Sequence, residues 1–109
     1  MPRLSMPVDM PHEVLVAIET IGNNVRTEIL RQTSEQGLTA LELADRIGVH
    51  PASIHRNLIV LERSGLVSAD VAAGRRRGQS VTWRTETDRV AELGRTWVRY
   101  ACSSASSRK

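Results

Sequence analysis

The segment 39–65, TALELADRIGVHPASIHRNLIVLERSG, places glycine, small and apolar residues at a spacing that few folds satisfy. Thr39-x-x-Glu42 is a capping-box pattern, in which each side chain bonds a free amide of the first helical turn, so a helix is predicted to begin there. Pro51 predicts the start of a second helix. Gly48 lies between them, where the backbone must turn sharply. The segment therefore predicts two short helices joined by a tight turn.

The apolar residues of this segment indicate that the two helices form a helix-turn-helix. Ala44 is small, which lets the second helix approach the first closely. Ile54 fills the space between the helices, and Leu58 and Leu61 continue its stripe at helical spacing. In this motif, the first turns of the second helix contact the base edges of duplex DNA. We therefore expect the face opposite Ile54 to be the reading surface.

That opposite face carries short polar and basic side chains. Arg56 can pair with guanine through two hydrogen bonds, Asn57 can pair with adenine in the same way, and the Ala52 methyl can contact thymine. The alternative is an ordinary exposed polar surface. We expect this helix to contact DNA through Pro51, Ala52, Ser53, His55, Arg56 and Asn57.

The apolar spacing changes from helical to alternating after Leu66, over 67–71 and again over 81–83. Between these runs lies AAGRRRGQ, in which two glycines flank three arginines. The pattern predicts a two-stranded hairpin with a basic tip and with Trp83 in the core. A loop that only adds solubility would look the same. We expect the three arginines to bind phosphate or to enter the minor groove: Arg75, Arg76 and Arg77.

Further helices are predicted on both sides of this unit. One begins near residues 9–10, and Asn23 can cap a second helix that runs to about Ser34. A last helix is predicted to begin near residues 85–87. Both terminal helices carry apolar stripes, and the lone helix at the end of the chain needs a surface on which to bury its stripe. The order of elements predicts a mainly α fold with a small β-hairpin (α+β), the winged helix-turn-helix.

Composition restricts the class of protein. The chain has 109 residues, enough for one domain, which we place at residues 9–101 between a flexible arm (1–8) and a disordered tail (102–109). No apolar run is long enough to span a bilayer, and no secretory signal is visible at the N-terminus, so a cytoplasmic protein is expected. The net charge is +3, and the sequence from Arg46 to Arg84 holds seven arginines against two acids. Such clustering is typical of nucleic-acid binding.

Metal and catalytic sites are not expected. Cys102 is the only cysteine, so neither an internal disulfide nor a thiolate metal site can form. His12, His50 and His55 do not make a ligand set. The glycine-flanked arginines lack the Lys-Ser/Thr and the strand-to-helix context of a phosphate-binding loop. We therefore predict no cofactor, no metal and no enzymatic activity.

Two stretches, LADRIGVHPASIHRNLIVLERSGLV and GNNVRTEIL, resemble the arsenic-repressor-type (ArsR-like) winged-helix regulators. The resemblance covers residues 10–101. It implies a homodimer that binds operator DNA, with the wing against the flanking backbone. His50 stands where the family usually has a capping serine, so a weaker start of that helix is expected. His55 and Asn57 also depart from the family pattern, so no base preference carries over. The implied dimer interface uses the terminal helices, through Val14, Ile18, Ile21, Val90, Leu93, Trp97 and Ala101.

The leading hypothesis is a sequence-specific transcriptional regulator, a repressor that binds double-stranded DNA as a homodimer on a pseudopalindromic operator. One alternative is a winged-helix adaptor that binds proteins. Another is a DNA-binding protein of a mobile element, with a role in replication, partition or recombination.

Overall fold

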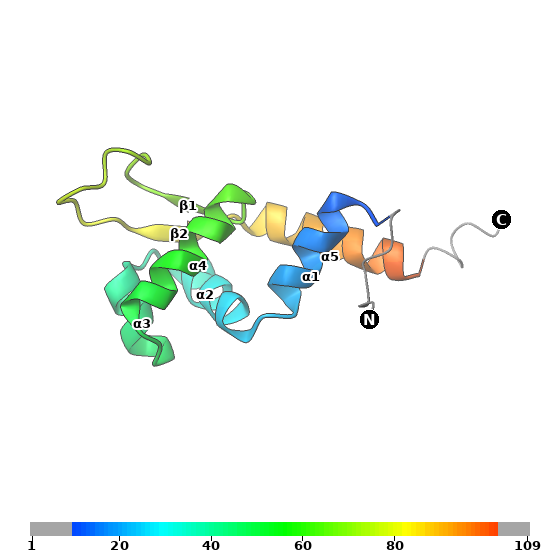
Figure 1. Ribbon diagram of the computed structural model, residues 1–109, viewed down its shortest axis with the longest axis horizontal. Coiled ribbons are helices and arrows are strands. Elements are labelled where there is room, and N and C mark those ends of the chain that lie inside the picture. The colour runs from blue at the N-terminus through cyan, green and yellow to red at the C-terminus, as the bar shows by residue number, and fades with distance from the viewer. Residues whose placement is uncertain (1–9, 103–109) are drawn as a thin grey trace, which may run out of the picture.

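Five helices and one small antiparallel sheet make up the part of the chain that the computed structural model describes, residues 10–102. This is the predicted winged helix-turn-helix architecture (Figure 1). The predicted arm (1–8) and all of the predicted tail except Cys102 lie outside the described residues. The elements are α1 (His12–Ile21), α2 (Asn24–Glu35), α3 (Ala40–Ile47), α4 (Pro51–Arg63), β1 (Val67–Ala69), β2 (Trp83–Thr85) and α5 (Thr87–Ala101).

Side-chain caps set the start of three helices. The Asn23 side chain accepts a hydrogen bond from the Arg26 amide at 3.0 Å, where α2 begins. The predicted capping box of α3 is confirmed, because Thr39 and Glu42 bond each other's backbone amides. His50 was expected to be a weaker cap than serine, yet its Nδ1 accepts a hydrogen bond from the Ala52 amide at 3.0 Å. The imidazole thus fulfils the capping role at the start of α4.

The turn between α3 and α4 depends on Gly48, whose φ of +81° lies in the left-handed region. This confirms the glycine signal of the sequence, since a side chain there would be strained. Most of the predicted inward residues of both helices are buried, and they pack with α2 and the hairpin into one core, whereas Ile47 is half-buried at its edge. Its most deeply buried large side chains include Ile29, Leu43, Ile54, Leu58, Leu61, Leu66 and Trp83.

The hairpin is shorter than the alternation of apolar residues predicts. Only Val67–Ala69 and Trp83–Thr85 pair as strands, and residues 70–82 form the loop between them. At its base, the Asp70 carboxylate accepts a hydrogen bond from the Thr82 amide at 2.8 Å, which ends the regular pairing. On the other side of β2, the Leu38 and Trp83 backbones bond each other in both directions, at 3.1 and 2.8 Å. The α2–α3 connection therefore lies beside the hairpin as a short third segment.

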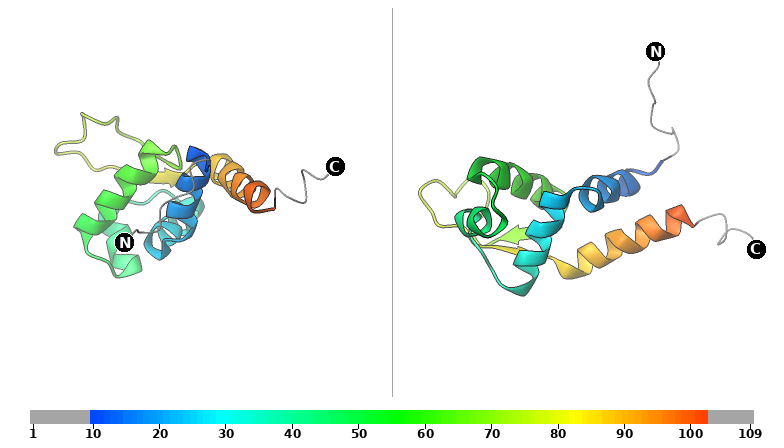
Figure 2. Two further views of the ribbon diagram at one scale, coloured as in Figure 1. Left: turned by 45° about the vertical axis from the view of Figure 1, so that its right-hand side comes forward. Right: turned by 90° about the horizontal axis from the view of Figure 1, so that it is seen from below.

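Helices α1 and α5 lie side by side at one end of the molecule, away from the hairpin loop (Figures 1 and 2). An ion pair of 2.8 Å joins Arg89 of α5 to Glu13 of α1. The sequence places Val14, Ile18, Ile21 and Val25 on one stripe at helical spacing, but the inward face of α1 uses Val14, Val16, Ala17 and Thr20. Ile18 and Ile21 stay exposed because they lie off the face that packs on α2 and α5.

We predict that Leu43 and Leu41, two residues apart on α3, differ sharply in their contribution to stability. Leu43 is fully buried, whereas Leu41 is 70% exposed. Leu43→Ala should lower the free energy of unfolding by about 2–5 kcal/mol, because a cavity is left in the core. Leu41→Ala should change it by less than about 0.5 kcal/mol. Urea unfolding measures both, and equal losses would contradict the described packing of α3.

Candidate nucleic-acid interface

One face of α4 is open along its first two turns. Pro51, Ala52, His55 and Arg56 are exposed and Ser53 is half-buried, whereas Ile54 and Leu58 on the other side lie in the core. The caps at its N-terminus fix the direction of the helix, and its buried stripe fixes its rotation. The predicted reading residues, Asn57 excepted, are therefore available to a partner.

Asn57 differs from this expectation, because both ends of its amide are already bonded. Its Oδ1 accepts a hydrogen bond from Arg26 Nε at 2.8 Å, and its Nδ2 donates to the Ser53 carbonyl at 2.8 Å. Arg26 also reaches the Glu19 carbonyl, at 3.4 Å, near the end of α1. Asn57 therefore joins α4 to α2 rather than presenting a free amide to adenine. Sequence reasoning missed Arg26, which lies 31 residues away in the chain.

Two consecutive turns shape the loop of the hairpin. In the first, the Arg75 amide donates to the Ala72 carbonyl at 3.0 Å, and in the second the Gln79 amide donates to the Arg76 carbonyl at 2.8 Å. The third residue of each turn is a glycine with positive φ, +91° at Gly74 and +73° at Gly78. A turn of this kind requires glycine at that position. The glycines that flank the arginines thus fold the loop, and the turns alternate the directions of the arginine side chains.

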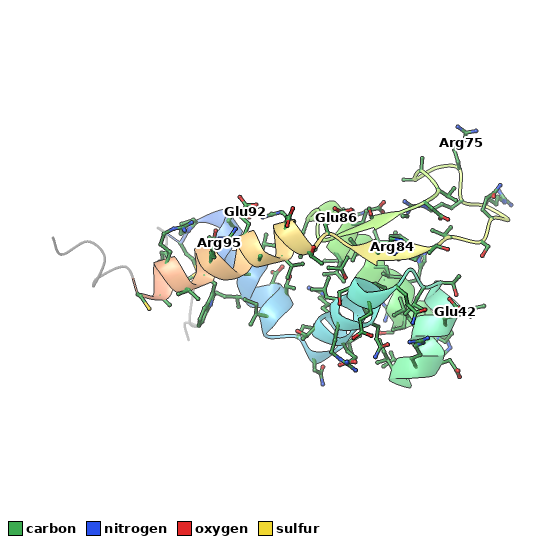
Figure 3. The ribbon with its side chains drawn as sticks, turned by 180° about the vertical axis from the view of Figure 1, so that it is seen from behind. Glu42, Arg75, Arg84, Glu86, Glu92 and Arg95 are labelled. Carbon is green, nitrogen blue, oxygen red and sulfur yellow. The ribbon has the colours of Figure 1, made fainter. Side chains whose placement is uncertain are left out.

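Arg75 and Arg77 point outward. Both are exposed, and no hydrogen bond or ion pair with another described residue engages their side chains. Figure 3 shows Arg75 on the upper edge of the loop, with its side chain directed away from the body of the molecule. These two guanidinium groups are free to bind an anion.

Arg76 points inward, which differs from the expectation that all three arginines contact DNA. Its guanidinium forms a two-pronged ion pair with Glu62 of α4, with Nη2–Oε2 at 2.6 Å and Nη1–Oε1 at 3.1 Å. Its Nε donates to the Val71 carbonyl at 2.7 Å, and its Cζ lies 4.9 Å from the centre of the Trp83 ring. The hydrogen bonds to Glu62 raise the pKa of Arg76. The charge of Arg76 is thus neutralised by Glu62 within the protein. The sequence contains one signal for this pairing, because Glu62 is one of only two acids between Arg46 and Arg84.

A hollow of about 300 Å³ separates the hairpin loop from the helix-turn-helix. His55 and Thr39 line one side, Gln79 and Ser80 line the other, and Trp83 lies between them. The exposed face of α4 and the hairpin loop therefore border one shared depression.

A second exposed surface lies on α1 and α5 and is apolar. Among residues 10–102, five of the six large exposed hydrophobic residues belong to these helices, and they are Ile18, Ile21, Trp97, Val98 and Tyr100. Val14 and Leu93, expected in a dimer interface, are instead 2% and 1% exposed. They are core residues, because α1 packs along α5 within the protomer. Sequence reasoning missed Val98, which lies outside the stripe through Leu93 and Trp97.

Between α2 and α5 this surface continues into a largely apolar groove of about 570 Å³. Ile21, Leu30, Val90 and Gly94 are among the residues that line it. In the described part of the chain, no helix is long and apolar enough to cross a membrane. Residues 10–102 also contain no cluster of three His, Cys, Asp or Glu side chains that could hold a metal ion.

Comparison with known proteins gives the same architecture. Residues 21–68 match the family model described as a helix-turn-helix domain. No curated protein matches the sequence significantly. Among solved structures, the chain is similar to an ArsR-like transcriptional regulator from Rhodococcus sp. RHA1, with 23% identity over 84% of this chain and 81% of that one and a TM-score of 0.65.

Two more structures are similar at the same level. The transcriptional repressor BigR from Xylella fastidiosa is 20% identical over 89% of each chain, with a TM-score of 0.59. Reduced HlyU from Vibrio cholerae is 24% identical over 75% of this chain and 82% of that one, with a TM-score of 0.58. The Rhodococcus protein is described as a transcriptional regulator and the Xylella protein as a transcriptional repressor. The chain thus contains a helix-turn-helix domain at residues 21–68 and has the winged helix-turn-helix fold of the ArsR-like transcriptional regulators.

Proposed function

We propose that the protein is a sequence-specific transcriptional regulator, a repressor that occupies a pseudopalindromic operator on double-stranded DNA as a homodimer. The observation that carries this proposal is the open face of α4 beside a loop that projects two exposed arginines, Arg75 and Arg77. Operator binding would block transcription by occupancy, and the function places the protein in the cytoplasm. One protein of the same fold is described as a repressor.

The two parts of the surface have different roles in this proposal. Pro51, Ala52, Ser53, His55 and Arg56 of α4 enter the major groove, where base pairs are distinguishable. Among them, Arg56 has the length and the paired donors to read guanine. Arg75 and Arg77 of the wing, the hairpin loop 70–82, contact phosphate or the minor groove of the flanking DNA. Arg76 and Asn57 make no direct contact in this account, because their polar groups are bonded within the protein.

The exposed apolar surface on α1 and α5 supports the proposal that a second copy of the chain binds there and forms the homodimer. Exposed Ile18, Ile21 and Trp97 lie on the helices that flank the reading unit, and the groove next to Ile21 extends their apolar area. Val90 and Ala101 belong to the same helix as Trp97. Two-fold pairing through this surface would bring two copies of α4 to half-sites about one helical turn apart.

Selection of binding sites from random duplex DNA tests the function directly. We expect an enriched inverted repeat with half-sites about one helical turn apart. With four outward wing arginines in a dimer, the slope of log affinity against log salt should be steeper than about −3. Salt-sensitive binding without an enriched sequence would contradict sequence specificity. The absence of binding would exclude the proposal.

Arg56 and the wing arginines should differ in the property that they control. Arg56→Ala should remove about 1–3 kcal/mol of discrimination at one base pair, because a major-groove contact is lost. The double variant Arg75→Ala/Arg77→Ala should weaken binding to all sequences and reduce the salt slope by about 1.8 per protomer. Binding isotherms on the selected site and on single-base variants separate the two effects. If the slope changes with Arg56 and not with the wing, their assigned roles are wrong.

Ile18→Glu or Trp97→Glu should weaken the dimer by at least about tenfold in Kd, because a buried carboxylate would lose its hydration without a partner. Leu41→Glu is the matched control, since Leu41 is exposed but lies on α3, away from the apolar surface. Sedimentation velocity reports the oligomeric state. A dimer that survives both α1 and α5 substitutions would show that the interface lies elsewhere.

A further inference from the structure

A side-chain cluster around Arg76 joins the two elements assigned to DNA. Arg76 lies in the second turn of the wing and Glu62 lies in the last turn of α4, 14 residues earlier in the chain. The guanidinium uses Nη1 and Nη2 on the carboxylate and Nε on the Val71 carbonyl. Its plane also lies near the Trp83 ring. One side chain thus bonds α4, the wing backbone and the core at once.

The geometry of this ion pair makes it a fixed contact. The side chains of Arg76 and Glu62 are only 16% and 28% exposed, and both carboxylate oxygens are engaged. The Arg31–Glu28 pair on α2 differs, because its side chains are 61% and 34% exposed and its partners are three residues apart on one helix. Two-pronged, partly buried pairs have a defined geometry, whereas exposed pairs contribute little. The Glu62–Arg76 contact can therefore hold two elements at a set distance.

We propose that Glu62 and Arg76 are positioning residues, which hold the wing in register with α4 so that Arg75 and Arg77 meet the DNA backbone while α4 occupies the major groove. The inference rests on the proposed DNA-binding function. The paired strands end at Ala69 and Trp83, and the Asp70–Thr82 hydrogen bond restrains only the base of the loop. Beyond that base, Val81 packs against the core at the end of the wing, and Arg76 bonds the second turn of the wing directly to α4. A wing without this contact would have to be ordered each time DNA binds, at a cost in affinity.

The charge of Glu62 gives the proposal a sharp test. A carboxylate on a DNA-binding surface opposes binding, so its removal ordinarily strengthens affinity. A positioning role predicts the reverse. Glu62→Gln should weaken binding to the selected site by about fivefold to tenfold even though the protein becomes more positive. Asp45→Asn removes one negative charge from an exposed position on α3 and is the matched control, with affinity unchanged or higher.

Arg76→Lys keeps the positive charge but loses the planar fork that bonds two oxygens at once. It should also weaken binding, while the salt slope stays near the wild-type value, because Arg76 does not itself contact phosphate. This outcome separates it from Arg75→Ala/Arg77→Ala, which reduces the slope. A thermal melt close to that of the wild type shows that each variant is folded.

Backbone dynamics of the free protein provide a readout that needs no DNA. In wild-type protein the Arg75 and Gln79 amides are bonded within the turns of the wing, and their ¹⁵N order parameters should be near those of the helices. Glu62→Gln should lower them. Unchanged order parameters, or affinity for DNA equal to or above that of the wild type, would overturn the positioning role. Wild-type protein that binds no DNA would instead overturn the proposed function.

Discussion

The burial of Trp83 connects the parts of this molecule that act together. Its backbone bonds Leu38 in the connection between α2 and α3, and its ring lies in the core beneath the guanidinium of Arg76. The hairpin is short, and two strands of three residues have little stability of their own. The wing therefore has a defined place because a large aromatic side chain anchors β2 in the core of the helix-turn-helix.

Around this anchor, the three consecutive arginines have separate tasks. The glycine turns direct Arg75 and Arg77 outward and Arg76 inward, so neighbours in the sequence experience different electrostatic surroundings. Two of the charges stay available for a polyanion, and the third is neutralised by Glu62. The count of arginines in the wing thus overstates the charge that it offers to DNA. Under the proposed function, Arg75 and Arg77 contribute affinity, the Glu62–Arg76 pair positions the wing, and Arg56 selects the base.

Local signals in the sequence were enough for the fold. The capping box at Thr39, the glycine at residue 48 and the stripe of Ile54 all depend on residues a few positions apart, and each has its predicted role. Most of the predicted DNA-contacting residues on α4 are also exposed.

The differences between expectation and structure share another origin, since each involves partners far apart in the chain. Asn57 is bonded by Arg26, Arg76 by Glu62, and Leu93 is buried where α5 runs beside α1. The spacing of apolar and polar residues predicts which residues share one face of a helix, but it does not predict which distant residues will contact that face.

The central claim is that α4 and the wing contact one duplex together, and hydroxyl-radical footprinting of the protein on its selected site tests it most directly. The account predicts two protected stretches of sugar-phosphate backbone about one helical turn apart, where α4 lies between the strands, each with further protected backbone on its outer flank. In the Arg75→Ala/Arg77→Ala variant, the flanking protection should disappear while the inner segments remain. Protection that is absent, or that lacks flanks in the wild-type protein, would contradict the account.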